Sequence, residues 1–207
     1  MHTESSRPSD APTPDAPAAN VAGNSRITGA IGAVIFVLLF FEGLTLFEIQ
    51  RFMWLHVFVG MLLVSFVVAK IASTGYRFSR YYMGQRDYVK NGAPPIILRL
   101  LGPIVTVLTV ALLATGIGTV LARHVDWLKF AHKASFVLWF GAMTIHVLGH
   151  ALETPALAFA DWRRSQRRQV PGAAARLVLL AVVVLAGVTL AVVTRGWAHH
   201  WRHLPGL

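Results

Sequence analysis

The chain has 207 residues, of which 55% are hydrophobic and 14% are charged, and its mean hydropathy is +0.57. This composition excludes a disordered or coiled-coil protein and argues against a soluble globular one, because a core of this size could not bury so many apolar side chains. The formal net charge is +10 and there are no cysteines, which excludes disulfides, thiolate metal sites and iron–sulfur clusters. Any redox chemistry would therefore require a bound cofactor.

The N-terminal segment differs from the rest of the chain. Residues 1–26 combine four prolines with Ala, Ser and Asp and contain almost no large apolar side chain. Such a segment buries too little surface to offset its ordering entropy, so we expect a disordered cytoplasmic tail. The first apolar run starts late and is long, which does not fit a cleaved signal peptide.

Five hydrophobic runs follow this segment, at residues 27–47, 52–73, 96–122, 130–151 and 177–194. Each run is long enough to cross ~30 Å of hydrocarbon as an α-helix. We therefore expect an all-α, polytopic integral membrane bundle of five transmembrane helices within residues 27–195. A short external tail, 196–207, containing His and Trp would follow.

Basic residues in the loops predict the orientation in the membrane. The loops after the second and fourth runs are rich in them: Arg77, Arg80, Arg86, Lys90, Arg163, Arg164, Arg167, Arg168 and Arg176. The other two loops hold only Arg51, Arg123 and Lys129. Since basic loops stay cytoplasmic, we expect the N-terminus inside and the C-terminus outside a bacterial plasma membrane. Basic and aromatic residues at this face predict contact with anionic lipid rather than nucleic acid.

Two histidines are expected at one depth in the bilayer. The second and fourth helices would run in the same direction, which places His56 and His132 at a similar level near the outer face. Two facing imidazoles inside a bundle are what bis-histidine ligation of a haem iron requires, although interfacial histidines are the simpler alternative. Gly60 would let a flat macrocycle approach the backbone. Glu42 could accept a hydrogen bond from a ligand histidine, or pair with a nearby basic side chain.

A second polar level follows 14 residues later on both helices, at Lys70 and His146. Fourteen residues bring a helix back to nearly the same face after about 21 Å, so a second haem could lie across the bilayer. A lysine ligand must first lose its proton, and Lys70 could instead extend to the headgroups. His146 could instead form a hydrogen bond between packed helices.

The quartet His56, Lys70, His132 and His146 resembles a degenerate form of the pattern in the bacterial haem-b membrane-domain superfamily. That superfamily includes di-haem cytochrome b and ferric-reductase-like transmembrane proteins. Segments 55–60, 70–78 and 132–136 also resemble uncharacterised actinobacterial membrane proteins, to which the resemblance is closest. The resemblance spans the first four helices and departs from the family pattern at Lys70, where the family has a histidine.

The residues and the resemblance together predict a membrane electron-transfer protein. One haem b would be held by His56 and His132, with a degenerate inner site at Lys70 and His146. Electrons would pass between a quinone or a redox partner protein and an acceptor at the outer surface. The chain has no flavin or nicotinamide motif, so it would act as a cytochrome-b-type oxidoreductase subunit if it belongs to an enzyme.

Two other function classes fit the same residues. One is a cofactor-free membrane scaffold or accessory subunit, in which the histidines are packing polar groups. The other is a proton or metal-ion carrier that uses Glu42, the histidines and Lys70 as a relay.

Overall fold

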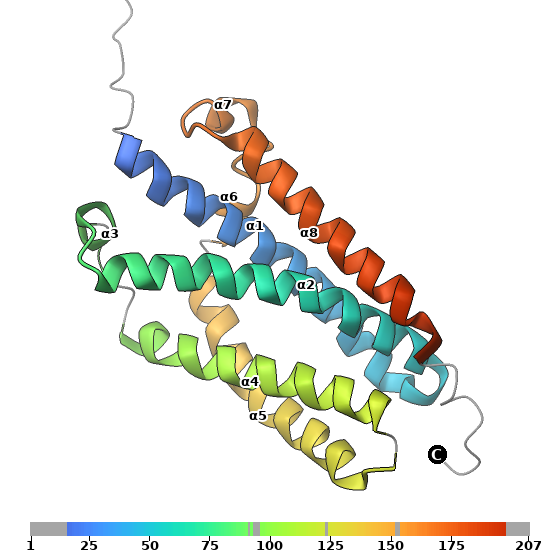
Figure 1. Cartoon of the computed structure of the whole chain (residues 1–207). Helices are drawn as coiled ribbons and strands as arrows, with labels where there is room; N and C mark the ends of the chain where they lie inside the picture. Colours follow the sequence, from blue (N-terminus) through green and yellow to red (C-terminus); the bar gives the residue numbers. More distant parts are fainter. Residues whose placement is uncertain (1–15, 91, 93–95, 123, 152–153, 198–207) are drawn as a thin grey trace, which may run out of the picture.

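The computed structural model describes residues 16–90, 92, 96–122, 124–151 and 154–197, and within these ranges the chain forms helices and no strands. The elements in chain order are α1 (Ala16–Thr45), the 3₁₀ turn η1 (Leu46–Glu48), α2 (Ile49–Tyr82), α3 (Arg86–Lys90), α4 (Ile96–Leu121), α5 (Asp126–His150), α6 (Thr154–Ala158), α7 (Arg164–Arg167) and α8 (Ala173–Thr194). Figure 1 shows α2 in the middle, with α1 and α8 on one side and the pair α4 and α5 on the other.

Helices α1 and α2 form an antiparallel hairpin. The contacts run in opposite directions along the two helices: Asn24 of α1 meets Ser73, Thr28 meets Lys70, and Glu42 meets His56. The turn between them is η1, and α2 has a non-helical residue at Phe52, where it kinks. Apolar side chains fill the space between these polar contacts, and Ile31 and Phe66 are almost fully buried there.

Helix α8 packs closely against α2. A Cβ on Gly187 would fall only 2.8 Å from Leu62 Cδ1 and 3.0 Å from its carbonyl oxygen. The Ser65 hydroxyl donates a hydrogen bond to the Val183 carbonyl oxygen across the same contact (3.1 Å). Small residues at helix contacts of this kind are typical of membrane bundles, where close backbone approach maximises van der Waals contact.

Helices α4 and α5 form a second hairpin. The Trp139 indole donates to Thr109 Oγ1 (2.9 Å), and Leu128 packs over Gly118. Val120 of α4 packs with Val57 and other residues of α2 and α8. Since α4 is antiparallel to both α2 and α5, the helices α2 and α5 run in the same direction, as the sequence predicts.

Three stretches of the described chain are long and apolar enough to cross a membrane: Ala19–Tyr82, Ile96–Leu121 and Ala173–Trp197. The first is 64 residues long and contains the α1–α2 hairpin except for the first three residues of α1. Helix α5 is not among them, since it carries charged and histidine side chains among its apolar residues. Many large apolar side chains point outward, such as Phe40, Val107 and Leu148. An outward apolar surface is typical of a protein surrounded by lipid.

The first helix begins earlier than the sequence predicts. Residues 16–26 were expected within a disordered tail, but they are the first turns of α1, and residues 1–15 lie outside the described part. Two polar residues in this segment, Asn24 and Arg26, make contacts inside the fold that composition could not reveal. Helix α2 likewise continues beyond residue 73, so Arg77 and Arg80 lie on the helix and not in a loop.

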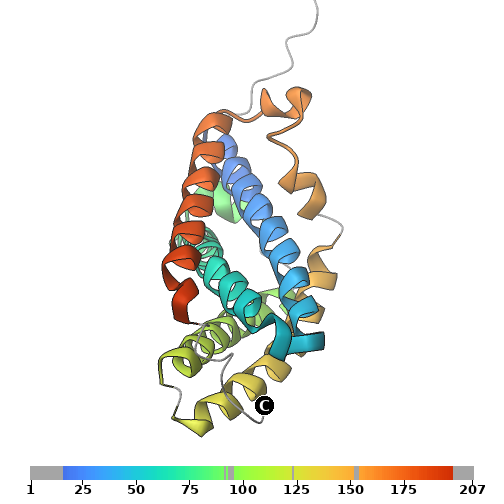
Figure 2. The same cartoon turned by 90° about the vertical axis from the view of Figure 1, so that its right-hand side faces the viewer.

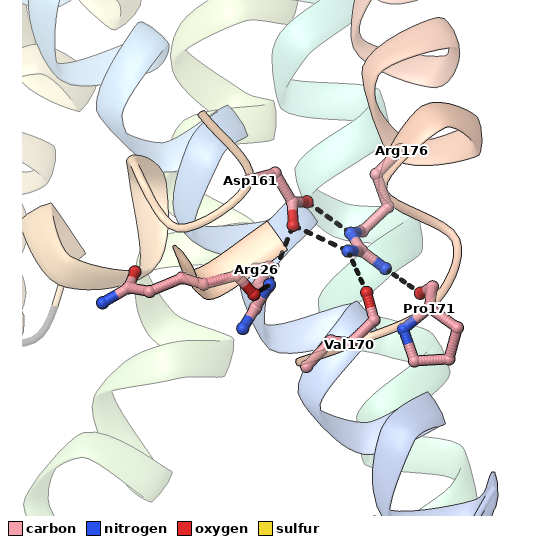
Figure 3. A network of polar contacts seen from close by, with 6 residues as sticks. Arg26, Asp161, Val170, Pro171 and Arg176 are labelled. Atoms are coloured by element: carbon pink, nitrogen blue, oxygen red, sulfur yellow. Dashed lines mark hydrogen bonds and ion pairs between the residues drawn. The ribbon is translucent and has the colours of Figure 1, made fainter. Parts of the chain in front are cut away.

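A buried ion-pair network connects the segment between α6 and α7 to both α1 and α8 (Figure 3). Asp161 is 7% exposed and accepts hydrogen bonds from Arg176 Nε (2.5 Å), Arg176 Nη2 (2.7 Å) and Arg26 Nη1 (3.0 Å). Arg176 also donates to the Pro171 carbonyl oxygen (2.8 Å), and Arg26 to that of Gln166 (2.9 Å). Next to this network α6 lies against α1 (Figure 2). One carboxylate therefore joins three segments of the chain.

Asp161→Asn should lower the free energy of unfolding by about 3 kcal/mol at neutral pH, because two guanidinium groups lose their shared buried counter-charge. Hydrogen bonds from Arg176 hold the pKa of the Asp161 carboxyl below its ordinary value of 3.8, against the opposing effect of burial. A lowered folded-state pKa stabilises the fold above about pH 4 and loses that effect as the pH falls further. The difference between wild type and variant should therefore shrink below pH 4 in SDS-unfolding titrations.

Asp126→Asn is the matched control, because Asp126 meets Lys129 at 3.3 Å with a side chain that is 91% exposed. We expect this change to cost less than about 1 kcal/mol. Equal losses in the two variants would contradict the role assigned to Asp161.

Candidate functional site

His56 lies in α2 with its ring held by α1. Its Nδ1 atom is 3.2 Å from Glu42 Oε1 and 2.9 Å from Thr45 Oγ1. The Thr45 hydroxyl donates its own proton to the Glu42 carbonyl oxygen (2.6 Å), so its oxygen accepts from His56. With the His56 proton on Nδ1, Thr45 Oγ1 and Glu42 Oε1 accept it and Nε2 keeps its lone pair. Of the two alternatives that the sequence leaves open for Glu42, the structure shows the contact with His56.

His132 lies in α5 with its ring held by α4. Its Nδ1 atom is 3.1 Å from the Leu112 carbonyl oxygen, which can only accept a hydrogen bond. Thr115 Oγ1 lies 3.4 Å from the same nitrogen. His132 is therefore also protonated at Nδ1 and keeps its lone pair at Nε2.

The two rings lie edge to face at the contact between the hairpins. Their centroids are 6.3 Å apart and their planes are inclined by 77°. The two histidines that the sequence places at one level are therefore neighbours in the fold. Metal–nitrogen bonds of about 2 Å, with half a ring added on each side, give about 6 Å between the centroids of two imidazoles on one metal. The observed separation matches this arrangement.

Two glycines border the site. A Cβ on Gly60 would lie 3.4 Å from Glu42 Oε1, so the missing side chain leaves room for the carboxylate that holds His56. A Cβ on Gly116 would lie 3.0 Å from His132 Cε1, closer than an ordinary contact. The approach of a macrocycle to Gly60 stays a prediction, whereas both glycines visibly make space for the histidines and their partners.

The two residues of the second predicted level, Lys70 and His146, are not arranged as a pair of ligands. Lys70 reaches across to α1, where its ammonium donates to the Thr28 carbonyl oxygen (2.8 Å) in the space left by Gly32. His146 Nδ1 is buried without a hydrogen-bond partner among the described residues. An ammonium that donates a hydrogen bond has no lone pair for a metal, so this geometry uses Lys70 to join α1 to α2.

Sequence reasoning missed the partners that orient the two histidines: Thr45, Thr115, Gly116 and the Leu112 carbonyl group. The two threonines offered a signal, because a hydroxyl in an apolar membrane helix commonly bonds a neighbouring helix. The Leu112 carbonyl offered none, since any backbone position can present one. The Asp161 network was missed as well, although Asp161 is an isolated acid before a run of arginines.

Within the described ranges no three His, Cys, Asp or Glu side chains are grouped so that they could hold a metal ion on their own. A haem iron needs only two ligands from the protein, because the porphyrin supplies the other four. The pair His56 and His132 therefore fits haem better than it fits a bare metal ion. Comparisons of the chain with protein-family models, curated proteins and solved structures found no match.

Gly116→Val should displace the His132 ring and lower the free energy of unfolding by about 1–3 kcal/mol, because it overpacks the contact between α4 and α5. SDS titration followed by circular dichroism measures this loss. Gly141→Val is the control, since a Cβ there meets nothing within 4 Å. Equal destabilisation by the two changes would show that the Gly116 contact is not tight.

Proposed function

We propose that this chain is a multi-pass membrane electron-transfer protein that binds one haem b between α2 and α5. The observation that carries the proposal is the state of the two histidines. The Nδ1 atom of each ring lies within hydrogen-bond distance of a fixed acceptor, so a proton there leaves the Nε2 lone pair for a metal, and the two ring centroids are 6.3 Å apart. Metal-bound histidines commonly have their second nitrogen fixed in this way.

The roles of the protein groups follow from this arrangement. His56 and His132 would be the axial ligands, while Glu42, Thr45 and the Leu112 carbonyl fix their orientation. A bound haem would supply one-electron chemistry. The low-polarity helices would keep water away from the site. A quinone or a redox partner protein would provide or remove the electrons, and an acceptor would lie at the outer surface.

We further infer five membrane passes with the N-terminus in the cytoplasm. The antiparallel contacts of α1 and α2 make the 64-residue apolar stretch two passes, and α5 would cross beside α4. The end of the bundle with Asp161 is rich in arginine, which favours the cytoplasmic side of a bacterial plasma membrane. Trp54, Trp127 and Trp197 lie near the opposite end of their helices, where interfacial aromatic residues are common.

A proton carrier is the second candidate, and one observation favours it. Among the described residues Glu42 Oε2 is buried without a hydrogen-bond partner, and its other oxygen contacts His56, which in turn contacts His132. Intramembrane carboxyl and imidazole groups in contact are typical of proton relays. If this candidate is correct, a pH gradient should drive protons across vesicles that contain the haem-free protein.

The purified chain should show a sharp reduced-minus-oxidised α-band and about one haem per chain, because two axial ligands are available. His56→Ala and His132→Ala should each abolish the band. His146→Ala should keep it, since His146 lies at the other level, and His124→Ala serves as a control on an exposed histidine. If the protein purifies without haem even after expression with a haem precursor, the electron-transfer proposal is overturned. The carrier and the scaffold would then be the remaining candidate functions.

Thr45→Val should weaken haem binding about 10-fold or more, because His56 loses a hydrogen-bond partner that fixes its ring. Haem titration of the apoprotein measures the change. Thr106→Val is the matched control, since the Thr106 hydroxyl bonds only the Gly102 carbonyl of its own helix. The same affinity in both variants would show that Thr45 does not position His56.

A further inference from the structure

A basic hollow lies at the beginning of α8. Its volume is about 480 Å³, and Arg167, Arg168, Gly172, Ala173 and Ala174 are among the residues that line it. Neither arginine side chain has a hydrogen-bond or ion-pair partner among the described residues. In the part of the chain that the structure describes, no carboxylate lines the hollow, and the first turn of α8 has no acidic residue. The hollow therefore carries uncompensated positive charge.

Asp161 does not neutralise this charge. Asp161 belongs to the same connecting segment, but its two oxygens are already bonded by Arg26 and Arg176. The fold thus divides the arginines of this segment into two groups. Arg176 bonds the buried Asp161, whereas the side chains of Arg167 and Arg168 are exposed at the surface.

The hollow lies at the end of a membrane-spanning helix. Ala173 begins both α8 and the apolar stretch that ends at Trp197. Phe159 and Trp162, in the turn before α7, are 55% and 67% exposed. Exposed aromatic rings beside arginines at a helix end are typical of the headgroup region of a bilayer.

A second hollow at the opposite end of the bundle has a different charge. It is lined by Gln50, Arg51, Met53 and Trp54 and has a volume of about 320 Å³. Its single arginine lies 3.6 Å from Glu48, so a carboxylate already balances it. An anion would therefore favour the hollow at α8.

We propose that the hollow of Arg167 and Arg168 binds the phosphate group of an anionic phospholipid in the adjoining leaflet. Guanidinium groups bind phosphate oxygens through charge-assisted hydrogen bonds, and the membrane supplies this ligand at the level of the hollow. The acyl chains would then lie along the apolar surface of α8. The proposal does not depend on haem binding.

Native mass spectrometry of the full chain in neutral detergent tests this site with added phosphatidylglycerol or phosphatidylcholine. The wild type should bind phosphatidylglycerol more tightly. The double variant R167A/R168A should bind it about 30-fold more weakly, because each arginine near an anionic lipid contributes about a factor of five. R167K/R168K should keep most of the affinity, because the charge remains.

R51A is the matched control, an arginine in the other hollow, and should leave the affinity unchanged. If R167A/R168A loses helical circular dichroism, R167Q/R168Q replaces it in the same measurement. Wild-type affinity in the folded double variant, or an equal loss in R51A, would overturn the proposal. Displacement of the lipid by millimolar inorganic phosphate would overturn it too, since it would identify a site for a soluble anion.

Discussion

The antiparallel contact between α1 and α2 is the interaction on which the rest of the structure depends. It pairs polar groups at both ends of the hairpin, Glu42 with His56 and Thr28 with Lys70, around an apolar middle where Ile31 and Phe66 are buried. In hydrocarbon a polar group without a partner is costly, so a shift of one helix along the other would break both polar levels at once. The register of the hairpin is therefore well defined.

The candidate site arises where this hairpin meets the second one. Each histidine is fixed by a helix of its own hairpin, His56 by α1 and His132 by α4, and each faces the other hairpin. Each hairpin supplies one of the two candidate histidines. Any cofactor held there would consequently join the two halves of the bundle and add to their association.

The sequence predicted what depends on helical spacing and hydropathy: the long apolar helices, the common direction of α2 and α5, and the meeting of His56 with His132. It did not predict the start of α1 at Ala16, because that helix is extended by polar contacts to distant segments. The role of Lys70 was missed for a related reason. Which carbonyl group a flexible ammonium reaches depends on neighbouring helices, which a periodic pattern does not describe.

The bond between Arg26 and Asp161 has a consequence for biosynthesis. The two residues are 135 positions apart, so the partner of Arg26 leaves the ribosome only after four long helices have been made. Until then the first helix carries an unpaired guanidinium near its N-terminal end, which can remain in water. The ion-pair network at this end of the bundle can form only after the segment with Asp161 and helix α8 have been synthesised. The first helix therefore obtains its buried ion pair from the last third of the chain.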